Sequence, residues 1–310
     1  MGKNRTLEQQ LTYAVRQSHN TGESKRYQKK TNPEWQELGK SWSFQTMGNR
    51  LELAHAFGKW MKQEYPDVKL AREIKAEHYN TFLETHKHKW SQATLTRYTS
   101  DLRAIQREIE HCYAKVPHMD VKRQIRANKG VTDGNKNVRS SEAMKKADFD
   151  KLTETTNKTL KDALTLAYTF GLRSEGICTI KAEDITEKDG KVYATVTEKG
   201  GRTRTVEALR EDWGKYAKQN LSDGREGRIC QAKPESLQRA LLREMKKTGM
   251  ADQYRGEKFH KIRKLYAQEL YDKHRQEHSK RESIQLVNVA LGHSAERDSD
   301  LLEKYVANIW

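Results

Sequence analysis

Apolar residues recur every three or four positions through two long stretches of the first 120 residues, which predicts amphipathic helices. The stretch TMGNRLELAHAFGKWMKQEY (46–65) places five apolar side chains on one face: Leu51, Ala54, Phe57, Trp60 and Met61. The stretch SQATLTRYTSDLRAIQREIEHCYAKV (91–116) does the same with Leu95, Tyr98, Leu102, Ile105 and Ile109, and Ser91 is a suitable N-cap. We therefore predict a bundle of roughly four helices over residues 43–118.

The residues before this bundle are mostly polar. Leu7, Leu11, Ala14 and Val15 have the spacing of one short amphipathic helix, and KRYQKK (25–30) is strongly basic. We expect residues 1–42 to form a separate N-terminal basic segment.

The period of the pattern changes in the second half of the chain. KVYATVT and RTRTVEAL alternate polar and apolar residues around EKGG, which predicts a β-hairpin over 191–209. Helical patterns occupy 148–170, 234–247, 258–272, 282–291 and 298–309. The expected fold class is therefore mainly α with a small antiparallel β-sheet (α+β), and residues 147–310 form its second domain.

The segment between the two domains, 119–146, carries eight basic and three acidic residues and few apolar ones. We interpret it as a basic interdomain linker. A linker along a phosphate backbone and a solvated tether would have the same composition. Five of its side chains are our candidates for contacts with such a phosphate backbone: Lys122, Arg123, Arg126, Lys129 and Arg139.

Charge narrows the choice of partner. The chain has 59 Lys and Arg against 43 Asp and Glu, a net charge of +16, which favours a polyanion such as nucleic acid over a basic protein without such a partner. Cys112, Cys178 and Cys230 are far apart with no CxxC pair, which favours a reducing compartment and argues against structural zinc or a disulfide framework. No apolar run approaches the length of a membrane span, and the N-terminus lacks a signal-peptide pattern, so a cytoplasmic, nucleoid-associated protein is expected.

Two stretches carry residues suited to phosphate chemistry. ALTLAYTFGLRSEG (163–176) reads as a buried helix that ends at Gly171 and presents Arg173. In FHKIRKLYAQEL (259–270), His260 and Arg263 are three residues apart and share a helix face, where an arginine clamp and a histidine can bind one phosphate.

Three further residues are unremarkable when taken singly. His293 follows Gly292, a suitable helix C-cap. Tyr305 lies beside leucines in LLEKYV, as an ordinary core tyrosine would. Lys199 occupies a hairpin turn whose glycines allow close approach of a ligand.

In order along the chain, the set resembles the tyrosine recombinase (phage integrase) family. GLRSEGICTIKAEDI is similar to its first arginine box, TEKGGRTRTV to its hairpin lysine, HKIRKLYA to its HxxR box, and LGHS with the later YV to its second histidine and nucleophile. The resemblance covers 147–310 well, and 43–118 more loosely resembles the helical core-binding domain. It implies a catalytic set of six residues: Arg173, Lys199, His260, Arg263, His293 and Tyr305.

The resemblance also implies the reaction and the partners. Tyr305 would attack a DNA phosphodiester to give a 3′-phosphotyrosine. Arg173, Arg263 and His293 would stabilise the negative charge on the phosphate. Lys199 would protonate the leaving oxygen, and His260 would assist proton transfer or bind the phosphate. No metal or nucleotide cofactor is expected. The expected partners are double-stranded recombination sites, bound by a homotetramer that is a monomer or weak oligomer when free, with accessory DNA-bending or directionality factors. Arg202 and Arg204 are further candidates for DNA contacts.

Three departures from the family pattern concern the site. The acid usually found three positions after the first arginine is replaced by Gly176, with Glu175 one position earlier. The segment between Arg263 and His293 contains the charged insertion DKHRQEHSKRES, and only VANIW follows Tyr305.

Other functions stay open at this point. A telomere resolvase or a type IB topoisomerase would use the same residues, and a degenerate relative would bind DNA without cleaving it. The sequence has no aromatic RNA-binding strand motif. His86 and His88 could hold a metal, but a solvated helix end is the favoured explanation. Among recombinases, integration of a mobile element is favoured over resolution of chromosome dimers.

Overall fold

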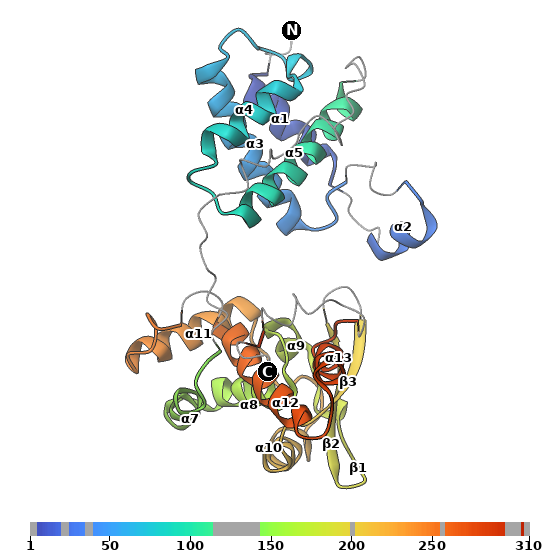
Figure 1. Cartoon of the computed structure of the whole chain (residues 1–310), viewed down its shortest axis with the longest axis vertical. Helices are drawn as coiled ribbons and strands as arrows, with labels where there is room; N and C mark the ends of the chain where they lie inside the picture. Colours follow the sequence, from blue (N-terminus) through green and yellow to red (C-terminus); the bar gives the residue numbers. More distant parts are fainter. Residues whose placement is uncertain are drawn as a thin grey trace. The chain divides into compact units, whose positions relative to one another are not determined.

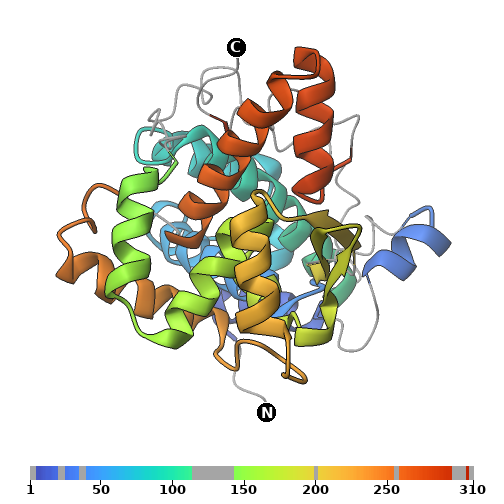
Figure 2. The same ribbon diagram turned by 90° about the horizontal axis from the view of Figure 1, so that it is seen from below.

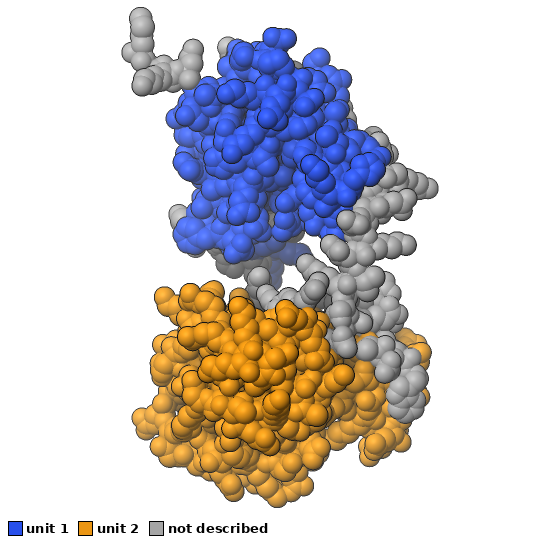
Figure 3. Space-filling model, turned by 90° about the vertical axis from the view of Figure 1, so that its left-hand side faces the viewer, with its two compact units in different colours: residues 1–138 blue, residues 139–310 orange. Residues whose placement is uncertain are grey.

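Two separate hydrophobic cores divide the chain. In this computed structural model the compact units are Met1–Val138 and Arg139–Trp310 (Figure 3). The residues that the structure describes are 5–19, 25–34, 40–113, 143–198, 202–254, 258–294 and 305–306.

The first unit is helical throughout its described part (Figure 1). Its core is built from the faces that the sequence pattern indicates, with Phe57, Leu102 and Ile105 fully buried. Ser91 caps its helix as predicted, since its side chain accepts a hydrogen bond from the Thr94 N–H. The elements are α1 (Leu7–Gln17), α2 (Lys25–Thr31), α3 (Phe44–Glu64), the 3₁₀ turn η1 (Ala71–Glu73), α4 (Ala76–His86) and α5 (Gln92–Cys112).

The N-terminal helix α1 belongs to this core, which differs from the separate segment 1–42 that we expected. Leu11, Ala14 and Val15 are fully buried against α3 and α5. The side chain of Gln10 also spans to η1, donating to the Lys69 carbonyl at 3.0 Å and accepting from the Ala71 N–H at 2.9 Å. The apolar face of α1 is too large to leave in water, so it completes the bundle.

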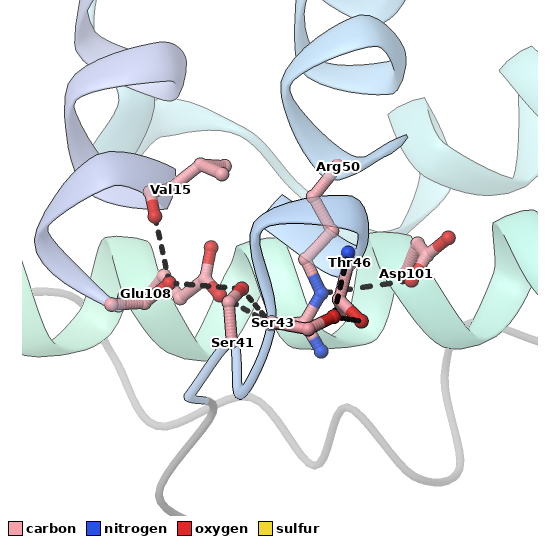
Figure 4. A network of polar contacts seen from close by, with 8 residues as sticks. Val15, Ser41, Ser43, Thr46, Arg50, Asp101 and Glu108 are labelled. Carbon is pink, nitrogen blue, oxygen red and sulfur yellow. Dashed lines mark hydrogen bonds and ion pairs between the residues drawn. The ribbon is translucent and has the colours of Figure 1, made fainter. Parts of the chain in front are cut away.

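A buried polar network holds the end of α1 and the start of α3 against α5 (Figure 4). The Arg50 guanidinium donates to Glu108 at 2.7 Å and to the Ser41 hydroxyl at 3.0 Å, and its Nε lies 3.6 Å from Asp101. Burial raises the pKa of Glu108 to about 7, while Arg50 acts in the opposite direction. The network fixes how the N-terminal segment meets the bundle.

The second unit is mainly helical with one small antiparallel sheet, which confirms the predicted fold class (Figures 1 and 2). Its elements are α7 (Lys146–Thr155), α8 (Lys158–Phe170), α9 (Ser174–Thr179), η3 (Ala182–Asp184), β1 (Ile185–Lys188), β2 (Lys191–Glu198), β3 (Arg202–Glu207), α10 (Glu211–Ala217), the π-helical turn η4 (Lys218–Ser222), α11 (Pro234–Lys247), α12 (Lys258–Arg275) and α13 (Lys280–Ala290).

The predicted hairpin is present as β2 and β3, and a third strand, β1, precedes it in the order β1-β2-β3. We did not predict β1. The turn between β1 and β2 has positive φ at Asp189 (52°) and Gly190 (73°), the conformation that a two-residue hairpin turn with an Asp-Gly sequence adopts. On the other two strands Thr195 and Thr205 pair on the exposed face.

Helix α8 is buried on all sides from Asp162 to Phe170 and packs against α12. The sequence pattern predicted one helix over 148–170, but the structure has two, because the backbone is extended at Thr156 and Asn157. Asn157 then caps α8 by accepting from the Leu160 N–H at 3.0 Å.

The later helices largely follow the prediction. Helix α11 has the predicted bounds, α12 extends three residues further, and α13 begins two residues earlier at a capping box formed by Ser279 and Glu282. The charged insertion therefore forms the end of α12, the start of α13 and the turn between them. The helix predicted over 298–309 lies outside the described residues except at 305–306. Within the described part of the chain, no helix combines the length and the apolar character that crossing a membrane requires.

Gly171, which ends α8, is expected to tolerate no side chain. Its φ is +59°, and an added Cβ would lie 2.4 Å from Cδ1 of Tyr266. We expect Gly171→Ala to lower the free energy of unfolding by roughly 2–4 kcal/mol, as left-handed strain and overpacking combine. Chemical denaturation measures this loss.

Gly190 provides the matched control, because its φ is +73° and an added Cβ meets nothing within 4 Å. Gly190→Ala should cost only the strain of the left-handed backbone, about 1 kcal/mol. Equal losses in the two variants would show that the contact with Tyr266 is unimportant.

Candidate active site

The first predicted arginine is held between two helices. Helix α8 ends at Gly171 in the left-handed conformation, Leu172 is buried, and Arg173 is the N-cap residue of α9. Ile177 and Ile180, both buried, anchor the following turn. The backbone around Arg173 is thus fixed on both sides, as a positioned phosphate ligand requires.

Arg173 lines a pocket of about 310 Å³. The pocket combines residues from α9, α11 and α12, so three parts of the sequence meet there. Its lining residues are Arg173, Ser174, Glu175, Gln238, Phe259, His260 and Arg263.

His260 and Arg263 reach the pocket from one face of α12, as their spacing predicts. Arg263 is fully buried, and its guanidinium donates to the carbonyl oxygens of Gly171 and Leu291, the latter at 2.5 Å. A buried guanidinium must be paired in this way, and these bonds orient its plane.

His293 is placed by the turn that ends α13. The Gly292 N–H donates to the Val289 carbonyl and the His293 N–H to the Asn288 carbonyl, both at 2.8 Å, and Gly292 has a φ of 75°. These bonds form a Schellman motif, which confirms Gly292 as the helix-ending glycine.

Tyr305 lies against these side chains although it is distant in sequence. Its ring centroid is 5.0 Å from that of His260 and 5.7 Å from that of His293, and the Arg263 Cζ lies 5.7 Å from it. The residue is 7% exposed. The structure therefore brings together four of the six predicted residues, with Arg173 in the same pocket as His260 and Arg263.

The charge state of His260 follows from these surroundings. The pKa of His260 is lowered to about 4, first by burial and then by the positive charges of Lys264, Arg263 and Arg173. At neutral pH the imidazole is uncharged and can accept a proton.

The depressed pKa of His260 predicts a pH-dependent stability. The unfolded chain binds this proton near pH 6.5 and the folded chain only near pH 4, so stability rises as the pH increases from about 4 to 6.5. An NMR titration of the His260 ring, assigned with His260→Gln, should show no protonation between pH 6 and 8. A midpoint at or above 6.5 would contradict the burial argument.

A sequence model of one protein family, described as integrase, matches residues 128–269. The match contains Arg173, Lys199, His260 and Arg263 in the family's order, and the geometry above adds His293 and Tyr305 to the same site. Over this stretch, a little less than half of its length, the chain is similar to the integrase family. No curated protein matches this sequence.

Solved structures with the same fold include one site-specific recombinase and two integrases. XerH site-specific recombinase bound to its palindromic difH substrate has 16% identity and a TM-score of 0.63, with 99% of this chain and 94% of that chain covered. A lambda integrase tetramer bound to a Holliday junction has 16% identity and a TM-score of 0.58, with 98% and 78% covered. The Tn1549 transposon integrase bound to circular-intermediate DNA has 12% identity and a TM-score of 0.53, with 96% and 95% covered.

Several of the predicted site residues lie outside the described part of the chain. They are Lys199 and the five linker residues Lys122, Arg123, Arg126, Lys129 and Arg139. Arg202 is described only through its backbone, as the partner of Glu198 in the hairpin. The roles of these residues remain predictions.

Arg204, which we expected to contact DNA, instead makes internal bonds. Its guanidinium donates to the Ala290 carbonyl and, at 3.4 Å, to the Gly171 carbonyl. The alternation of the strand explains this, because Arg204 shares a face with buried Val206 and lies opposite buried Val196. The same signal in the sequence would have placed Arg204 on the inner face.

Sequence reasoning missed Gln238, which lines the pocket from α11. It also left open where the family's acid lies: Glu175 lines the pocket, whereas Gly176 is buried in α9. A helical-wheel reading of α11 separates Gln238 from buried Leu237 and Leu241 but does not indicate a pocket.

The histidines considered for a metal have other surroundings. The His86 ring stacks on Trp90 at 4.7 Å, and His88 is exposed. Among the described residues, no group of three or more His, Cys, Asp and Glu side chains is arranged to hold a metal ion.

Proposed function

We propose that this recombinase cuts and rejoins double-stranded DNA through a covalent bond to Tyr305. The Tyr305 hydroxyl oxygen attacks the scissile phosphorus, the bond from phosphorus to the 5′-oxygen breaks, and a 3′-phosphotyrosine and a free 5′-hydroxyl result. The 5′-hydroxyl of a second strand then reverses the step, so the bond energy is conserved. The observation that carries the proposal is the convergence of Tyr305, His260, His293 and Arg263 beside the pocket of Arg173.

Arg173 and Arg263 are suited to the charge of the transition state. Both line one pocket, and their guanidinium groups can donate to the two non-bridging oxygens of a phosphate. Because the backbone at Arg173 and the guanidinium plane of Arg263 are fixed before DNA binds, little reorganisation is needed during the reaction.

His260 is suited to accept the proton of the Tyr305 hydroxyl. The centroids of the two rings are 5.0 Å apart, and the ring of His260 is uncharged at physiological pH, so it has a free nitrogen lone pair to accept the proton. Lys199 is proposed to protonate the 5′-oxygen as it leaves, and His293 to donate a hydrogen bond to the phosphate.

DNA binding is supported by positive charge on a helix that lines the pocket. Helix α11 contributes Gln238 to the lining and carries Arg239 and Arg243 on its exposed side. With the basic linker and a net charge of +16, these residues favour a long contact with a phosphate backbone. We propose that a tetramer on two DNA sites performs the exchange, as the lambda integrase tetramer on a Holliday junction illustrates for that protein.

Binding should weaken steeply with salt. A contact with six or more phosphates predicts a loss of affinity of roughly 10³-fold or more between 50 and 200 mM salt. In fluorescence anisotropy titrations, Arg239→Ala and Arg243→Ala should each reduce the slope of log K against log salt by about 1. Lys215→Ala, on α10 and paired with Glu211, is the control and should leave it unchanged. A flat response of the unaltered protein would contradict DNA binding.

The products distinguish the recombinase from enzymes that share its chemistry. Exchanged duplexes support recombination, hairpin ends a telomere resolvase, and relaxed supercoils alone a type IB topoisomerase. We propose integration or excision of a mobile element as the biological reaction, and the experiment that tests it is recombination between two duplexes that carry the element's own ends.

A further inference from the structure

We infer that Arg204 is a positioning residue that fixes the distance between the two turns that carry Arg173 and His293. The inference rests on the proposed function, because it assigns Arg204 a role in that reaction. Arg204 lies on β3 and outside the set of residues that line the pocket. It would therefore act through the backbone and not through contact with DNA.

The two bonds of Arg204 join two chain reversals that carry catalytic side chains. One acceptor is the carbonyl of Gly171, two residues before Arg173, and the other is the carbonyl of Ala290, three residues before His293. Figure 1 shows β3 beside α13, in agreement with the contacts between these elements. A planar guanidinium can donate to both carbonyls at once, which fixes the distance between the two reversals.

Arg204 also completes the hydrogen bonding at the end of α13. The final carbonyls of a helix lack partners within the helix. Here the Val287 carbonyl accepts from the Leu291 N–H. The carbonyls of Asn288 and Val289 accept the two bonds of the Schellman motif described above. Arg204 takes the Ala290 carbonyl and Arg263 the Leu291 carbonyl.

Arg204, from strand β3, and Arg263, from the proposed catalytic set, both donate to the Gly171 carbonyl. Each of them therefore joins the turn after α8 to the turn after α13. Two adjacent positive charges are tolerated because the C-terminal ends of α8 and α13 both present partial negative charge. Loss of Arg204 would leave Arg263 alone between the turns. A misplacement of about 1 Å at a reacting centre can cost 10²-fold in rate.

The test is the single-turnover cleavage of a DNA duplex by Arg204→Ala, with Thr205→Ala as the control on the exposed face of the same strand. We expect Arg204→Ala to bind DNA within about 3-fold of the unaltered protein but to cleave roughly 10- to 100-fold more slowly. Thr205→Ala should cleave normally. Cleavage by Arg204→Ala at the unaltered rate would overturn the inference.

A second substrate separates positioning from a merely structural role. A methylphosphonate at the scissile position removes one negative oxygen, so it needs less help from Arg173 and His293. The defect of Arg204→Ala should be at least several-fold smaller on this substrate than on the phosphate. An equal defect on both would overturn the inference.

Arg204→Lys keeps the test decisive if Arg204→Ala does not fold. A lysine has no planar fork to bridge two carbonyls, so we expect at least about a 10-fold slower cleavage with an unchanged thermal midpoint. Cleavage by Arg204→Lys at the unaltered rate would overturn the inference. If the unaltered protein forms no covalent adduct at all, the proposed function fails, which is a different result from normal cleavage by the Arg204 variants.

Discussion

Tyr305→Phe is expected to bind DNA with unchanged affinity and to form no covalent adduct. The phenyl ring keeps the contacts with His260 and His293, whose ring centroids lie 5.0 and 5.7 Å away, but the attacking oxygen is absent. Loss of a covalent nucleophile lowers the rate by roughly 10⁴-fold or more. The measurement is the covalent complex that survives denaturing electrophoresis after incubation with labelled DNA.

Tyr27→Phe is the matched control for this change, because Tyr27 lies on α2 in the first unit and is 63% exposed. It should form the adduct at the unaltered rate. A covalent complex with Tyr305→Phe would show that another residue is the nucleophile. Loss of DNA binding by Tyr305→Phe would instead show that its hydroxyl serves mainly in folding or binding.

Arg263→Lys is expected to have the second largest effect, in both cleavage and stability. The guanidinium of Arg263 is fully buried, donates to the carbonyls of Gly171 and Leu291, and also lines the pocket. A lysine cannot reproduce this fork. We expect cleavage to fall by roughly 10²- to 10³-fold and the free energy of unfolding to fall by about 1–3 kcal/mol through the unpaired carbonyl.

Single-turnover cleavage and chemical denaturation measure the two effects of Arg263→Lys. Arg210→Lys makes the same chemical change in an exposed ion pair with Asp212 and should alter neither. If Arg263→Lys lost stability but kept its cleavage rate, Arg263 would be a structural residue only.

Local signals in the sequence were sufficient to locate most helices and the β2–β3 hairpin, and to place part of the site. The helical pattern over 234–247 gave the correct bounds of α11, and the spacing of His260 and Arg263 correctly placed them on one face. The missed strand β1 had a readable signal as well, the turn of Asp189 and Gly190. The break between α7 and α8 is likewise signalled by Asn157, a preferred N-cap residue.

Long-range packing could not be predicted in the same way. The pocket residue Gln238 and the contact between Tyr305 and His260 depend on how distant helices meet. The position of α1 in the first core depends on the room left by α3 and α5. Such contacts are set by the shape of the whole core, which no local period encodes.

The most direct test of the account is to trap the covalent complex and identify the attached residue. A nicked duplex whose cleaved end diffuses away prevents rejoining, and proteolysis followed by mass spectrometry then locates the bound nucleotide. The account predicts a peptide that contains Tyr305, joined through its phenolic oxygen to a 3′-phosphate. A nucleotide on any other residue, or on none, would contradict it.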